Sequence, residues 1–344
     1  MTLLLDDPTE DAPAEGVQEQ DAPRSVDPGL GRVDKTFRFT VRGIGMFVLV
    51  MTVAIGGFLG WQATHTYHDY GLKFFYGTTF DPSRNLFQIA PILLGTVEVA
   101  LVALAVGFPI ALMTALFITE YAPSRLKSPL IALVDMMAAV PSVIVGVWAV
   151  KWLQDRAIFT TRWISQNLGW IPIFHVDGDI DAASNTWQIN FIGSVAIAGL
   201  VVGLMIVPLA CSVMRGVFDL APLSEREAAY ALGSTKWGMI RTVVIPFGRG
   251  GIIGGTMLAL GRALGETVAV LLIITNDDTP KIQVLSGGTD TISAMIASQF
   301  GNAHQGQLAA YLTAGFVLFV MTIAVNTVAA IFVNRSRSGA GVDV

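Results

Sequence analysis

Two ionisable side chains stand four residues apart inside a long, mostly apolar segment. Arg262 and Glu266 both lie within residues 248–275. A charged side chain near the centre of a bilayer costs about 2.5–3.5 kcal/mol on insertion scales, so such residues normally face protein or water and mark a functional path. If the segment is one helix, the two side chains share a face. An arginine suits an oxyanion, because its planar guanidinium is permanently charged and donates several hydrogen bonds.

The order of these two charges argues against a simple ion pair within one helix. A cation four residues before an anion is the weaker arrangement. We therefore expect Arg262 and Glu266 to meet a partner across an interface, as part of an anion path or its gate. A purely structural pair between subunits is the alternative.

The polar connection before this segment has the features of a short helix and a turn. Ser224 could cap the helix, and Glu225 and Glu227 favour its positive amino-terminal end. Gly233 could end it, and Pro246 precedes the next apolar segment. A short rigid element between two spans suits docking to a soluble partner better than it suits catalysis. An ordinary connecting loop is the alternative.

The spacing in this connection resembles the EAA loop of ABC-importer permeases. Glu227-Ala228-Ala229 is followed after three residues by Gly233, and after nine more by Val243-Val-Ile-Pro246. The resemblance implies a coupling helix that inserts into a groove of a cytoplasmic ATPase. It also implies that Glu227, Ala228, Ala229 and Gly233 are the ATPase contacts.

The apolar segment itself resembles phosphate-importer permeases of the PstC type, on the stretch Leu260-Gly-Arg-Ala-Leu-Gly-Glu-Thr267. Supporting matches run from about residue 80 to 333. Sulfate and molybdate permeases have a similar arginine and glutamate but usually follow the glutamate with Phe-Gly, where this chain has Thr267-Val268. The resemblance implies that Arg262, Glu266 and Thr267 belong to the anion path or gate, and it favours phosphate. A permease for sulfate, molybdate or another oxyanion is the alternative.

The same resemblance implies the partners. They are a homologous second permease of the PstA type, two cytoplasmic ATPase subunits of the PstB type, and an extracytoplasmic phosphate-binding protein of the PstS type. This chain has no Gly-rich loop ending in Gly-Lys-Ser or Gly-Lys-Thr, so ATP must be used by partner subunits. We expect no catalytic residues and no bound cofactor in this chain. We also expect no metal site, because its histidines lack the partners that a metal site needs.

The composition is that of an integral membrane protein. Apolar residues make up 53% of the 344 positions and charged residues 14%, with a mean hydropathy of +0.61. A helix of about 20 residues crosses the hydrocarbon layer. We therefore expect an all-α bundle of six transmembrane helices within residues 39–334, in the type I ABC-importer permease fold that the resemblance implies. The predicted spans are residues 41–62, 87–118, 129–150, 190–214, 248–275 and 308–333.

Two details of this bundle follow from its segments. The second span is too long for a straight crossing and contains Pro91 and Pro109, so we expect a bent or two-part helix there. The first helix should lie at the periphery of the bundle.

The distribution of Lys and Arg indicates the orientation. Fourteen of these residues lie in the two terminal segments and the connections on the same side, and six lie on the other side. Both termini should therefore face the cytoplasm, as should the coupling loop at about 219–247. The expected location is the plasma membrane of a prokaryote.

The two ends of the chain should be cytoplasmic tails. Residues 1–38 are rich in carboxylates, proline and glutamine, which predicts a disordered acidic tail, and residues 335–344 form a short second tail. Without the acidic tail the chain is slightly basic, and nothing indicates nucleic-acid binding.

The outer connection at 151–189 contains four tryptophans. Anchoring in membrane lipid is their simpler interpretation, and docking of an external partner is the alternative. They are Trp152, Trp163, Trp170 and Trp187.

A few further residues have more than one interpretation. Glu98 and Asp135 lie in apolar surroundings and could line the pathway or bond a neighbouring helix, with nothing to choose between these roles. The single cysteine, Cys211, should be a small buried side chain. A secondary transporter without ATP would need internal repeats, and a membrane-embedded enzyme would need a catalytic cluster. We find neither in the sequence.

Overall fold

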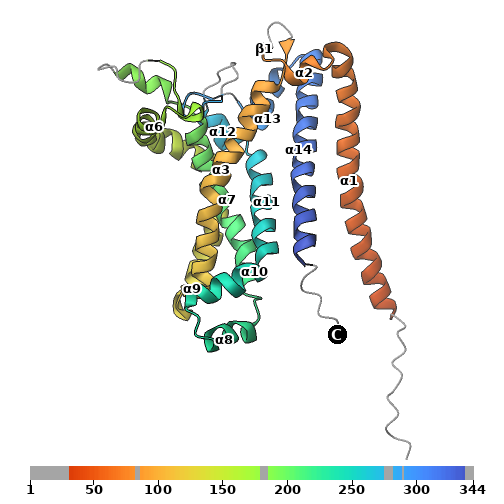
Figure 1. Ribbon diagram of the computed structural model, residues 1–344. Helices are drawn as coiled ribbons and strands as arrows, with labels where there is room; N and C mark the ends of the chain where they lie inside the picture. Colours follow the sequence, from red (N-terminus) through yellow and green to blue (C-terminus); the bar gives the residue numbers. More distant parts are fainter. Residues whose placement is uncertain (1–30, 82–85, 179–184, 275–281, 289, 338–344) are drawn as a thin grey trace, which may run out of the picture. The chain divides into compact units, whose positions relative to one another are not determined.

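The computed structural model describes residues 31–81, 86–178, 185–274, 282–288 and 290–337. These residues are almost entirely helical (Figure 1). The exception is a short antiparallel pair, β1 (Phe80–Asp81) and β2 (Leu86–Phe87). The chain separates into two units, residues up to Val53 and residues from Ala54 onward. The predicted all-α class is confirmed.

The first unit contains the first part of α1 (Arg32–Tyr70). The helix begins at Arg32, so the prediction that the disordered tail extends to residue 38 was wrong. Arginine and lysine are good helix formers, and Asp34 in the first turn favours the positive end of the helix dipole. Residues 1–30 of the predicted tail lie outside the described part of the chain.

Four helical stretches among the described residues are long and apolar enough to cross a membrane. They are Arg32–His68, Ala90–Tyr121, Val195–Phe218 and Gln307–Val333. Two bent helix pairs meet the same criteria together: Ser124–Ala138 with Ser142–Leu168, and Lys236–Phe247 with Arg249–Leu264. The predicted number of six spans is reached if each bent pair is one span.

The second span is not divided, although a two-part helix was one of the forms that we expected. Helix α3 (Ala90–Leu116) continues through Pro109 and is followed by a π-helical turn, η2 (Phe117–Tyr121). Pro91 lies in the first turn, where its missing N–H costs nothing. Membrane helices tolerate an interior proline when their surroundings satisfy the freed backbone group. The two-part form of the prediction was therefore wrong, and the bent form stays a prediction.

The third predicted span, 129–150, is broken instead. Helix α4 (Ser124–Ala138) ends before Pro141, and the chain turns by 87° into the continuous stretch Ser142–Leu168. Proline disfavours helical backbone at the residue before it, which explains the position of the break. The stretch after the turn comprises α5 (Ser142–Trp148), η3 (Ala149–Leu153) and α6 (Gln154–Leu168).

The predicted outer connection is thus helical over its first part. Trp187 of this connection is buried, with the Arg162 guanidinium 4.1 Å above its ring, so it is a core residue. Trp152, Trp163 and Trp170 are exposed. Membrane anchoring stays a prediction for these three tryptophans.

The fifth predicted span, 248–275, is also interrupted. Helix α11 (Arg249–Leu264) ends at Gly265, and a new helix, α12 (Val268–Ile273), begins after Thr267. Helix α11 is preceded by the short elements α9 (Lys236–Met239), η6 (Ile240–Val244) and α10 (Ile245–Phe247). The segment is therefore two helices with a break of three residues.

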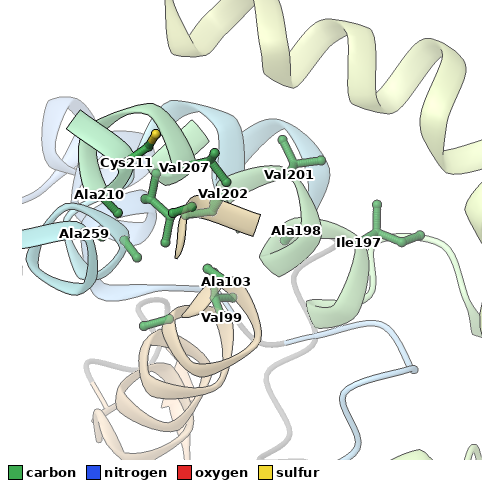
Figure 2. Packing of buried hydrophobic residues seen from close by; sticks show 14 of the residues in the cluster. Val99, Ala103, Ile197, Ala198, Val201, Val202, Val207, Ala210, Cys211 and Ala259 are labelled. Carbon is green, nitrogen blue, oxygen red and sulfur yellow. The ribbon is translucent and has the colours of Figure 1, made fainter. Parts of the chain in front are cut away.

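The core of the second unit lies where α3 and α7 (Val195–Phe218) pack side by side (Figure 1). Close approach requires glycine: a Cβ on Gly107 would lie 2.8 Å from the Gly203 carbonyl oxygen, and one on Gly203 would lie 2.9 Å from the Ala103 carbonyl oxygen. Figure 2 shows Val99 and Ala103 facing the small and branched residues of α7. Cys211 is fully buried in the same cluster, as predicted.

The remaining helices complete the unit. Helix α14 (Gln305–Arg337) packs against α11, and it includes residues 335–337 of the predicted second tail. The connection between α12 and α14 contains α13 (Ile292–Gln299) and η7 (Phe300–Asn302). Three short elements lie in the other connections: α2 (Lys73–Tyr76), η4 (Pro172–Phe174) and η5 (Asn185–Asn190).

Candidate functional site

A short exposed helix, α8 (Leu223–Ala231), lies at one end of the bundle, near the end of α7 (Figure 1). Gly233 ends it with a left-handed backbone, φ +80°. The Gly233 N–H donates to the Tyr230 carbonyl at 2.9 Å, and the Ser234 N–H donates to the Ala229 carbonyl at 3.1 Å. This is the Schellman arrangement, which satisfies the last carbonyls of a helix. The prediction that Gly233 ends the helix is confirmed.

The start of α8 differs from the prediction. Pro222 occupies the capping position without a side-chain hydrogen bond, and Ser224 lies inside the helix. The next element is capped instead: the Thr235 hydroxyl accepts from the Gly238 N–H at 3.1 Å at the start of α9. Two successive helices are thus joined by a turn with satisfied backbone groups, which fixes the direction in which α8 points.

Three of the four predicted ATPase contacts are exposed. Glu227, Ala228 and Gly233 face solvent, whereas Ala229 is half-buried and packs against the core. Ala229 therefore holds α8 against the bundle. Exposed large apolar side chains lie on α8 and α9 and in the turns next to them, and such patches on a protein surface mark interaction sites. They are Leu220, Leu223, Tyr230, Leu232 and Trp237.

Polar contacts attach this end of the molecule to the bundle. Arg226 forms an ion pair with Glu120 (Nη1 to Oε1, 2.9 Å), and its Nη2 donates to the Phe218 carbonyl at 2.6 Å. Lys127 forms an ion pair of 2.9 Å with Asp219. Sequence reasoning missed these partners, because Arg226 and Glu120 are far apart in the chain.

The second candidate group lies at the break between α11 and α12. Arg262 is in the last turn of α11 and is exposed. Glu266 lies beyond the end of that helix, so the prediction that the two side chains share a helical face was wrong. The physical reason is the helix end at Leu264 and Gly265. The ion pairs among the described residues do not include one between Arg262 and Glu266.

Glu266 is buried, and its contacts are structural. Its Oε1 accepts from the Ala269 N–H at 3.5 Å, at the start of α12, and its carbonyl accepts from the Ser293 hydroxyl at 2.8 Å. Thr267 is half-buried, and its hydroxyl donates to the Gly265 carbonyl at 3.2 Å. Glu266 thus stabilises the break, while Arg262 presents its charge outward next to it. Broken helices of this kind form substrate sites in other membrane transporters.

The other ionisable residues in apolar segments occupy different environments. Glu98 is buried within α3, and neither carboxylate oxygen has a hydrogen-bond partner among the described residues. Asp135 is exposed on α4. Across the described residues, no group of three or more His, Cys, Asp and Glu side chains is placed to hold a metal ion.

Comparisons with known proteins give consistent matches. The family model of the inner membrane component of binding-protein-dependent transport systems matches residues 107–338. The phosphate transport system permease protein PstC 2 of Mycobacterium tuberculosis is 36% identical over 302 residues, which is 87% of this chain and 91% of that protein. The permease protein PstC of Xylella fastidiosa is 34% identical over 320 residues, or 92% of this chain and 96% of that protein.

A solved structure supports the fold. A bacterial ABC transporter involved in the import of the acidic polysaccharide alginate contains a chain with a TM-score of 0.50 to this one. The match covers 88% of this chain and 99% of that chain, at 16% sequence identity. At this identity the likeness concerns the fold alone.

Proposed function

This chain belongs to the family of binding-protein-dependent transport system inner membrane components, and we propose that it is the permease subunit of an ATP-driven importer that moves inorganic phosphate into the cytoplasm. The observation that carries the choice of substrate is the match to relatives named phosphate permeases over about nine tenths of both chains. The stretch from Gly261 to Thr267 supports the same anion.

The exposed end formed by α8 and α9 is the proposed ATPase contact. Glu227, Ala228 and Gly233 face outward, next to the exposed Leu232 and Trp237. A short helix with exposed apolar side chains, closed at its end by the Gly233 turn, is rigid enough to insert into a groove and transmit force. Ala229 packs this helix against the core of the bundle. Closure of two ATPase subunits around ATP would then push on α8 and rock the permease subunits against each other.

Arg262 is the proposed anion contact. Its side chain is exposed on the isolated chain, as a residue on a path between two permease subunits must be. Thr267 lies half-buried in the adjacent break and could donate its hydroxyl to the same anion. Glu266 has a positioning role in the gate, because it is buried and bonded to the start of α12.

The remaining parts of the proposal concern assembly. The second permease would be of the PstA type, the ATPases of the PstB type and the external binding protein of the PstS type. Both termini would face the cytoplasm of a prokaryotic cell, with α8 on the same side, as the distribution of Lys and Arg indicates. This chain would bind no cofactor, and ATP would be hydrolysed by the partners.

Uptake of labelled phosphate tests the function. Cells that lack this gene are compared with the same cells carrying it again, at micromolar phosphate, with sulfate or molybdate as competitors. We expect restored uptake that neither competitor reduces and that stops when ATP is depleted while ion gradients persist. Unchanged phosphate uptake would refute the substrate, and uptake that continues without ATP would refute the coupling.

A further inference from the structure

One guanidinium connects α8 to two other helices. Arg226 is only 18% exposed, and Glu120, its partner on η2, is 5% exposed. The same side chain also donates to the carbonyl of Phe218, the last residue of α7. Carbonyls in the last turn of a helix lack partners within the helix, and a cation is favourable at that end. Arg226 therefore links α8 to the end of α7 and to η2, the turn that directly follows α3.

The contact depends on arginine rather than on any positive charge. A guanidinium offers a planar fork of donors, so one end can pair with Glu120 while another bonds the Phe218 carbonyl. A lysine ammonium can reach one of these acceptors well but cannot span both in this geometry. Among the described polar side chains of α8, Arg226 is the one that bonds to another helix.

Helix α9, which follows α8 after the Gly233 turn, contacts the residue next to Glu120. The Lys236 ammonium of α9 lies 4.8 Å from the centre of the Tyr121 ring, and Tyr121 follows Glu120 in η2. Helices α8 and α9 thus contact consecutive residues of one π-helical turn, α8 through Glu120 and α9 through Tyr121. Such turns are rare in proteins as a whole, and those that occur are often found at functional sites.

We propose that Arg226 and Glu120 form a clamp through which movement of α8 is transmitted to α3 and α7. This inference rests on the proposed function. Helices α3 and α7 pack through Gly107 and Gly203 at backbone distance, so they move together. A force on α8 then either carries both helices with it or breaks the buried ion pair, which would leave the Glu120 carboxylate without its partner. Arg226 is a positioning residue in this scheme.

Charge exchange tests the clamp in the complete reconstituted transporter. The variants are R226E, E120R, the E120R/R226E double variant and R226K. Arg125 is exposed at the start of α4 and has no ion pair among the described residues, so R125E is the matched control. Phosphate uptake and ATP hydrolysis are measured on the same samples.

We expect each single reversal to lower uptake by about tenfold or more, while hydrolysis falls much less, so that more ATP is used per anion. The double variant should transport several-fold better than either single variant, because the ion pair is restored. R226K should be intermediate, since it loses the Phe218 carbonyl contact. R125E should behave as the original protein does. A purely structural defect would instead lower uptake and hydrolysis together.

Hydrogen exchange of α8 gives a second measurement that does not depend on the anion. In the purified permease, α8 amides should exchange about tenfold faster in R226E and recover in the double variant. Unchanged exchange in R226E, or a double variant no better than the singles in either assay, would overturn the clamp. If the original protein fails to take up phosphate while exchange follows this pattern, the proposed substrate is refuted and the clamp stands.

Discussion

Replacing Gly233 by alanine is expected to weaken binding of the ATPase through the backbone alone. Gly233 has φ +80°, and a Cβ added there would meet no atom within 4 Å. Steric conflict with neighbours therefore contributes nothing. A left-handed backbone costs an ordinary L-residue about 1–2 kcal/mol. This corresponds to a factor of about 5–30 in the balance between the native turn and its alternatives.

The turn matters because it sets the direction of α8. The hydrogen bonds from Gly233 and Ser234 close the end of the helix, and Thr235 starts the next one directly afterwards. If only the native turn binds the ATPase, the apparent affinity falls with the population of that turn. The expected loss for Gly233→Ala is thus up to about 5–30-fold.

The assay is a titration of purified permease with purified ATPase, using three variants. Asparagine tolerates left-handed backbone better than alanine does, and a β-branched residue is a genuine outlier there. We expect affinity to fall in the order Gly233→Asn, Gly233→Ala, Gly233→Val. Gly216→Ala is the matched control, because Gly216 lies in α7, also has open space around its Cβ position, and has no positive φ.

Two results would refute this reasoning. If Gly233→Ala binds as tightly as the original protein, the left-handed turn does not determine the docking geometry. If Gly233→Asn is as weak as Gly233→Val, the loss comes from side-chain size at the interface and the backbone argument fails.

Three further predictions concern other parts of the chain. Arg262→Ala should abolish phosphate uptake at unchanged membrane levels of the complex, whereas Arg262→Lys should retain part of it, because lysine keeps the charge but loses the fork of donors; normal uptake by the alanine variant would exclude Arg262 from the anion path. Gly203→Val should lower the free energy of unfolding by about 1–3 kcal/mol, because a Cβ at this position meets a backbone oxygen at 2.9 Å; denaturation in detergent, with Gly216→Ala as the control, measures this. Burial raises the pKa of Asp290, which precedes α13, from 3.8 to about 6. The folded state then favours the neutral acid, so the contribution of Asp290 to stability should be largest below about pH 4 and be lost, by up to about 3 kcal/mol, as the pH rises through 6; Asp290→Asn should remove this part of the pH dependence in thermal unfolding.

Properties that depend on local sequence could be predicted. The apolar segments identified the four unbroken spans, because length and hydropathy are local properties of the sequence. They did not show that the third and fifth spans are broken. The end of α8 at Gly233 followed from the conformational freedom of glycine. Burial of Cys211 followed from its apolar surroundings. None of these needed knowledge of what lies across from the residue.

Properties set by tertiary contacts could not be predicted. The local sequence does not indicate a partner for Arg226, because Glu120 lies at the end of a helix far away in the sequence. Ser224 has a good capping side chain, but Pro222 fixes an extended backbone two residues earlier and the helix starts there instead. In both cases the competing contact or backbone constraint outweighed the local preference.

The break after Leu264 has the largest consequence for function. In an unbroken helix Arg262 and Glu266 would be equivalent members of one polar face, and both would be candidates to touch the anion. The break separates them: Glu266 is turned inward to the start of α12, and Arg262 stays exposed on α11. A buried carboxylate close to the path would repel an anion, and the Ala269 N–H, 3.5 Å from Oε1 of Glu266, compensates part of that charge. We therefore propose that Arg262 contacts the anion and that Glu266 holds the broken helix in shape.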